Sequence, residues 1–103
     1  MSNETQATTE LATYRETLDR LDAALVYLLA ERFSVTEAIG QLKATLDLPP
    51  LDSEREQTQL ERLREIARSA GLESTHVERV FREITGMVRE RHEEIRKYNE
   101  DRR

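Results

Sequence analysis

The feature that most constrains this chain is an uninterrupted helical pattern in its N-terminal half. From about Thr9 to about Leu46 the apolar residues follow a 3-4-3-4 spacing, and no glycine or proline lies between Leu11 and Ile39. The apolar positions are Leu11, Tyr14, Leu18, Leu21, Leu25, Leu28, Val35, Ile39 and Leu42. This spacing is the period of a helix that packs along an apolar seam.

A helix of this length is too long for the rest of the chain to cover. At about 1.5 Å per residue, some ~35 residues span roughly 50 Å, whereas a compact domain of about 100 residues has a radius of gyration near 13 Å. A second copy can cover the seam if the two long helices lie side by side. We therefore expect an obligate homodimer. The alternative is a break near residues 32–34, which would give a monomeric four-helix bundle.

A second helix is expected after a proline break. Leu48 precedes Pro49 and Pro50, which cannot continue the first helix. Either Asp52 or Ser53 caps the next helix, and Glu56 follows Ser53 by three residues, as in a capping box.

The second helix is expected to run to Ala70, where Gly71 follows as a C-terminal glycine. Ser74 or Thr75 opens a third helix. Its inner face carries Val77, Phe81, Ile84, Val88, Ile95 and Tyr98. No strand pattern or repeat is present, so the fold class is all-α, with three helices and a long first one.

Composition narrows the function classes. The 103 residues carry a net charge of −5 and no cysteine, which argues against a nucleic-acid surface, a disulfide scaffold and thiolate chemistry. No apolar run approaches the ~20 residues of a membrane span, and residues 1–10 lack the features of a secretion signal. We expect a cytoplasmic protein with a flexible tail over residues 1–9, a helical domain over residues 10–98 and a polar tail over residues 99–103.

Charged residues interrupt the apolar faces. Arg32 occupies a position where the 3-4 spacing of the first helix predicts an apolar residue. Lys43 lies about three turns further along the same helix. Glu56 occupies the seam position before Leu60, and His92 lies one turn after Val88 on the inner face of the third helix. A buried ion pair or a register-setting role would explain Arg32 alone, and a hydrogen-bonded core or boundary histidine would explain His92 alone. Together they can converge inside one bundle.

Other charged residues have ordinary interpretations when taken singly. Arg15 and Arg55 would usually be surface cations, and Asp52 would usually be only a helix cap. The run from Arg89 to Arg96 is expected to be mostly a solvated face. The sequence has no metal-ligand spacing on a helix, phosphate loop or nucleophile elbow, so no metal or nucleophile is expected.

Four segments in order resemble the all-helical chorismate mutases. These are YRETLDRLD (residues 14–22), LLAER (28–32), IGQLK (39–43) and DSERE (52–56), and the resemblance extends over about residues 10–97. It implies an intertwined homodimer of three-helix chains with two active sites. It also implies conversion of chorismate, a dianion, to prephenate on the route to phenylalanine and tyrosine, without cofactor. Activation by a larger aromatic-pathway enzyme stays open.

The resemblance also implies roles for particular residues. Arg32 and the partner subunit's Arg15 match the groups that bind the two substrate carboxylates, and guanidinium forks suit carboxylates. Arg55 matches an arginine that helps to set the carboxylate geometry. Lys43 matches the cation beside the ether oxygen, where negative charge builds in the transition state.

The remaining matched positions include two departures from the family pattern. Asp52 and Glu56 match the acids that hold the ring hydroxyl. His92 stands where the pattern has glutamine as a second donor to the ether oxygen. Val88 stands where it has serine, so a hydrogen bond is lost there.

Three rival functions remain open at this stage. An isochorismate–pyruvate lyase of the same fold would keep Arg15, Arg32 and Lys43, but Glu56 favours the mutase. A mutase acting on 4-amino-4-deoxychorismate would also suit Asp52 and Glu56. A non-catalytic helical dimer would use its polar seam residues for register alone.

Overall fold

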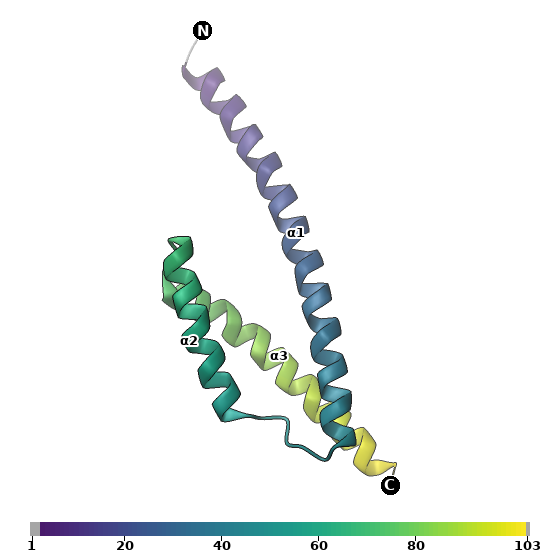
Figure 1. Cartoon of the computed structure of the whole chain (residues 1–103). Helices are drawn as coiled ribbons and strands as arrows, with labels where there is room; N and C mark the ends of the chain where they lie inside the picture. Colours follow the sequence, from purple (N-terminus) through teal and green to yellow (C-terminus); the bar gives the residue numbers. More distant parts are fainter. Residues whose placement is uncertain (1–2, 103) are drawn as a thin grey trace. The chain divides into compact units, whose positions relative to one another are not determined.

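The computed structural model describes residues 3–102, most of which lie in three helices (Figure 1). These are α1 (Asn3–Thr45), α2 (Ser53–Ala70) and α3 (Ser74–Asp101), and no strand occurs within the described range. The predicted all-α class with a long first helix is confirmed. Because α1 is continuous through residues 32–34, the four-helix alternative is wrong.

The first helix begins at Asn3 rather than near Thr9. Threonine hydroxyls in this segment bond back along the helix: Thr8 Oγ1 donates to the Glu4 carbonyl at 2.7 Å and Thr9 Oγ1 to the Thr5 carbonyl at 3.0 Å. Such bonds satisfy the hydroxyls without competing for the helix N–H groups. Glu4 also lies in the first turn, where a carboxylate favours the helix dipole. Residues 3–9, predicted as part of a tail, are therefore helical.

The C-terminus of α1 is closed by a left-handed residue. Asp47 has φ 59°, the Leu48 N–H donates to the Lys43 carbonyl at 2.8 Å, and the Asp47 N–H donates to the Ala44 carbonyl at 3.2 Å. This pair of bonds is the Schellman arrangement, and aspartate tolerates the left-handed region better than most residues. Pro49 then prevents the helix from resuming.

Both ends of α2 are capped, and one predicted detail is wrong. The Asp52 carboxylate accepts from the Arg55 N–H at 3.1 Å, which makes Asp52 the N-cap and Ser53 the first helical residue. The Ser53–Glu56 capping box is therefore absent. Gly71, with φ 73°, ends α2 as predicted, and the Leu72 N–H donates to the Ala67 carbonyl at 2.8 Å.

The third helix has a weaker start and a later end than predicted. Its N-cap residue is Glu73, whose side chain makes no capping hydrogen bond, while the backbone N–H groups of His76 and Val77 donate to the Glu73 carbonyl. The helix continues to Asp101, so much of the polar segment predicted as a C-terminal tail is helical.

The chain divides into two compact units, Met1–Ser34 and Val35–Arg103, called here the N-terminal and C-terminal units. The described part of the N-terminal unit is helix alone. Most of its large apolar side chains are 47–78% exposed, namely Leu11, Tyr14, Leu18, Leu21, Leu25, Val26, Tyr27 and Leu28, while Leu29 and Phe33 are half-buried. Exposed apolar area on this scale is typical of an interaction surface.

The C-terminal unit has a small core drawn from the end of α1 and from the two shorter helices. Its buried residues are Gly40, Ala44, Ala67, Ile84, His92 and Ile95. Small side chains allow the helices to approach closely, and His92 is the one polar side chain among these six. No helix in the described range has the length and apolar character needed to cross a membrane.

Candidate active site

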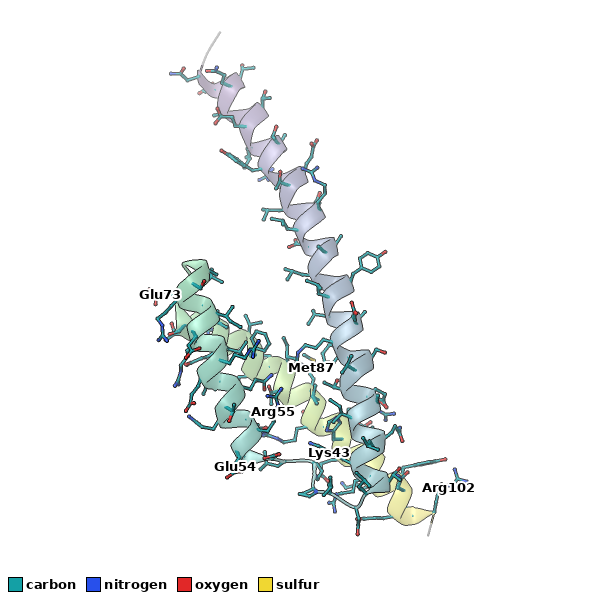
Figure 2. All side chains as sticks on the ribbon, in the orientation of Figure 1. Lys43, Glu54, Arg55, Glu73, Met87 and Arg102 are labelled. Atoms are coloured by element: carbon teal, nitrogen blue, oxygen red, sulfur yellow. The ribbon has the colours of Figure 1, made fainter. Side chains whose placement is uncertain are left out.

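The last turn of α1 carries Lys43, whose ammonium is held at the loop leading to α2. Lys43 is half-buried, and its Nζ donates to the Pro50 carbonyl oxygen at 3.2 Å. Figure 2 shows it near the C-terminal end of α1. A cation in the last turn also interacts favourably with the helix dipole. The Schellman turn returns the chain toward Lys43, which brings the Pro50 carbonyl within reach.

The first turn of α2 carries three predicted site residues. Asp52 and Arg55 are exposed, whereas Glu56 is half-buried. One oxygen of Asp52 is committed to the helix cap, which fixes the direction of its carboxylate. Arg55 lies in this first turn (Figure 2). The predicted site residues therefore place two carboxylates and one guanidinium close to the N-terminus of the helix, where Glu54 adds a third carboxylate.

A cavity of about 300 Å³ lies between α2 and α3, and Glu56 lines it. The Glu56 Oε1 accepts from Arg89 Nη2 on α3 at 2.7 Å. Deeper along the same helix pair, Arg64 forms an ion pair with Glu78. The lining residues are Glu56, Gln59, Leu60, Leu63, Arg64, Glu78, Phe81, Arg82, Thr85 and Arg89. The cavity is thus partly apolar, with charged side chains from both helices.

His92 is buried against the end of α1. Its Nε2 lies 2.8 Å from the Thr36 carbonyl oxygen, so the hydrogen on Nε2 is assigned to a bond that His92 donates. The ring packs directly over Gly40: a Cβ there would lie 2.5 Å from Cδ2 and 2.9 Å from Nε2 of His92. Only glycine leaves room for the ring in this position.

Val88 lies on the same helix one turn before His92 and is half-buried. Its side chain has no hydrogen-bonding atom, so this position contributes apolar contact alone. The predicted inner-face positions Val88 and His92 are therefore both at least partly covered in the C-terminal unit.

An ion pair joins α1 to α3 beside His92. Arg91 donates to both carboxylate oxygens of Glu37, at 2.7 Å from Nε and 3.1 Å from Nη2. The Arg91 hydrogen bonds lower the pKa of the Glu37 carboxyl, and the Glu37 bond in turn raises the pKa of Arg91. The hydrogen bond that Arg96 donates to the Glu93 carboxylate likewise raises the pKa of Arg96 within α3. The ion pairs therefore favour the charged forms of Glu37, Arg91 and Arg96.

Arg15 and Arg32 belong to the N-terminal unit. Arg15 is exposed and Arg32 is half-buried. Their assignment to substrate carboxylates stays a prediction, as does the partner subunit's contribution. Among the described residues, no cluster of three or more potential metal ligands occurs.

Sequence reasoning did not identify Thr36, Gly40 or Arg89. The run of charges on α3 was expected to be mostly solvated, but Arg89 and Arg91 each bond to a glutamate of another helix while staying about half exposed. The available signal was helical spacing, since Arg89 follows Val88 directly and lies three residues before His92. The carbonyl of Thr36 left no signal, because every residue carries one.

The fold and the site together define an all-helical protein with cationic and acidic groups gathered around the α2–α3 cavity and the end of α1. Comparison with known proteins agrees with this description. The sequence pattern of the family "Chorismate mutase type II" matches residues 14–93. The chain therefore belongs to the chorismate mutase type II family.

The chain is also similar in sequence to part of a curated, longer protein. The chain is 33% identical over 75 residues to the T-protein of Enterobacter agglomerans. The aligned stretch is 73% of this chain and 20% of the T-protein, so the chain spans about a fifth of that relative's length.

Proposed function

We propose that this protein is a chorismate mutase, which converts chorismate to prephenate by an intramolecular Claisen rearrangement in phenylalanine and tyrosine biosynthesis. The observation that carries the proposal is the family match over residues 14–93, because all eight predicted site residues, from Arg15 to His92, fall inside it. The reaction uses no cofactor. We also propose a cytoplasmic location, with activation by another aromatic-pathway enzyme as an open extension.

The rearrangement breaks one C–O bond and forms one C–C bond, with no proton transfer. Its catalyst must hold the flexible dianion in a compact chair and stabilise charge on the ether oxygen. In the proposed site Arg32 binds one carboxylate, and Arg15 from the partner binds the other. Arg55 helps to set the carboxylate geometry, and Lys43 donates to the ether oxygen. Lys43 is suited to this because its ammonium is already restrained by the Pro50 carbonyl.

The second donor to the ether oxygen is proposed to be His92, and its present hydrogen bond limits how it can act. With Nε2–H bonded to Thr36, a neutral ring offers Nδ1 only as an acceptor. Donation to the substrate therefore requires a proton on Nδ1 as well, or rotation of the ring away from Thr36. An imidazolium would keep the Thr36 bond and donate from Nδ1 at the same time.

The two acids of α2 are proposed to hold the ring hydroxyl. Asp52 is oriented by its capping bond and Glu56 by Arg89, so both carboxylates are directed before substrate binds. Preorganised groups of this kind avoid reorganisation during the reaction. Val88 supplies apolar contact to the substrate.

We further propose a homodimer with the N-terminal units of two chains packed together. The support is the series of apolar side chains on α1, which are about half exposed or more in the single chain. Burial of one such leucine stabilises an interface by roughly 1.5–3 kcal/mol. Several of them on each chain are enough to offset the entropy of association.

The test is an absorbance assay of chorismate loss with identification of the product after acid treatment. Prephenate becomes phenylpyruvate, whereas a lyase would release pyruvate from isochorismate. Sedimentation velocity on the same sample gives the oligomeric state. A purified, folded dimer that leaves chorismate unchanged would contradict the mutase assignment and favour a non-catalytic helical module.

A further inference from the structure

Arg89 is one of the charged residues that line the α2–α3 cavity, and in the proposed chemistry it orients Glu56 without binding the substrate itself. Arg89 follows Val88 on α3, and its Nη2 bonds to Glu56 Oε1 at 2.7 Å. Both side chains line the cavity of about 300 Å³. Glu56 is the acid proposed to hold the ring substituent, so its partner influences which substituent it accepts.

We propose that Arg89 is a specificity-determining positioning residue, which holds Glu56 and makes the site select a ring hydroxyl over a ring amine. The inference rests on the proposed mutase function and concerns the same site. One guanidinium already balances the charge of Glu56, so this carboxylate is suited to accept a hydrogen bond from a neutral hydroxyl. The arginine also fixes the direction of the carboxylate, as a charge-assisted bond does.

An amine in place of the hydroxyl would be repelled by the charge of Arg89. Near neutral pH it is an ammonium, and a bond to Glu56 would bring it within a few ångströms of the Arg89 guanidinium. Like charges at such a distance repel, and their juxtaposition disfavours a complex strongly. Three arginines and two glutamates line the cavity, and Arg64 and Glu78 neutralise each other. The other residues that line the cavity therefore supply no net negative charge to offset the repulsion.

Solvent weakens the repulsion between Arg89 and a ring amine. The side chains of Arg89 and Glu56 are 48% and 36% exposed, so water and salt screen their interaction. We therefore expect one charge to change the preference about tenfold rather than by several orders of magnitude.

The test compares kcat/KM for chorismate and for 4-amino-4-deoxychorismate, in which an amine replaces the ring hydroxyl. The variants are Arg89→Gln, which removes the charge and keeps a donor to Glu56, and Arg89→Lys, which keeps the charge. The matched control is Arg91→Gln, since Arg91 is also an α3 arginine bonded to a glutamate of another helix and is about half exposed. Circular dichroism establishes that all of them fold.

The expected result is a wild-type preference for chorismate that Arg89→Gln shifts toward the amine by about tenfold, mainly through a lower KM for the amine. Arg89→Lys retains most of the preference, and Arg91→Gln leaves it at the wild-type value. High salt narrows the preference of the wild type, because salt screens the repulsion between Arg89 and the ammonium of the amine.

Failure of this inference is distinguishable from failure of the proposed function. A wild type that converts chorismate, with the same preference in Arg89→Gln, overturns the role of Arg89 and leaves the mutase assignment intact. An equal shift in Arg91→Gln also overturns it, since any loss of positive charge would then suffice. A wild type inactive on both compounds overturns the mutase assignment and the inference together.

Discussion

Replacing Gly40 with alanine tests the packing of His92 against α1. The new Cβ would lie 2.5 Å from Cδ2 and 2.9 Å from Nε2 of His92, and 3.0 Å from Cδ1 of Ile95. His92 is 6% exposed and bonded to the Thr36 carbonyl, so the ring cannot move aside without losing that bond. The substitution therefore combines overpacking with the loss of a hydrogen bond.

Three effects set the magnitude. Overpacking destabilises by about 1–3 kcal/mol, and the lost hydrogen bond costs about 1 kcal/mol. Against these, alanine is favoured over glycine inside a helix by about 1 kcal/mol. The net expectation for Gly40→Ala is a loss of about 1–3 kcal/mol. Gly86→Ala is the matched control, because a Cβ there meets no atom within 4 Å in this chain. It should stabilise by up to about 1 kcal/mol.

The assay is urea unfolding followed by circular dichroism, with every variant at the same protomer concentration because the proposed dimerisation would contribute to stability. A double variant completes the design: once His92→Ala has removed the ring, Gly40→Ala should no longer destabilise, which gives a coupling of about 1–3 kcal/mol. Equal effects of Gly40→Ala and Gly86→Ala, or a Gly40→Ala cost that persists without the His92 ring, would refute the packing argument.

The remaining predictions concern the charged groups. Arg32→Ala should leave a folded protein but cost on the order of 2–4 kcal/mol in transition-state binding; turnover within threefold of wild type would contradict its assignment. Refolding Arg15→Ala together with Lys43→Ala should recover activity in heterodimers if Arg15 acts across the dimer, and verified heterodimers without activity would show that it does not. Arg91 lowers the pKa of Glu37, so stabilisation by this carboxylate is present above its ordinary pKa and is lost as pH falls through the lowered folded value. Carboxyl NMR titration should show Glu37 below the usual range in wild type and closer to it in Arg91→Gln, and an unchanged Glu37 titration would contradict the pairing.

The helices and most of their ends were predictable from sequence because their causes are local. Apolar spacing identified all three helices, Pro49 and Pro50 marked the break after α1, and Gly71 marked the end of α2. The start of α1 was placed about six residues late, because a polar segment rich in threonine has no apolar period to reveal it. The Ser53–Glu56 capping box failed for a related reason: adjacent Asp52 and Ser53 are both good caps, and the pattern does not choose between them.

The partners of Glu56 and His92 were decided by tertiary structure alone. Sequence placed Glu56 and His92 on inner faces by helical period, but the Glu56–Arg89 pair joins residues 33 positions apart and the His92–Thr36 bond joins residues 56 apart. Such contacts depend on how two helices cross, which no local pattern encodes. Gly40 is the clearest case. In the sequence it is an unfavourable glycine inside a strong helix, and its reason appears only when the ring of His92 occupies the space that a side chain would fill.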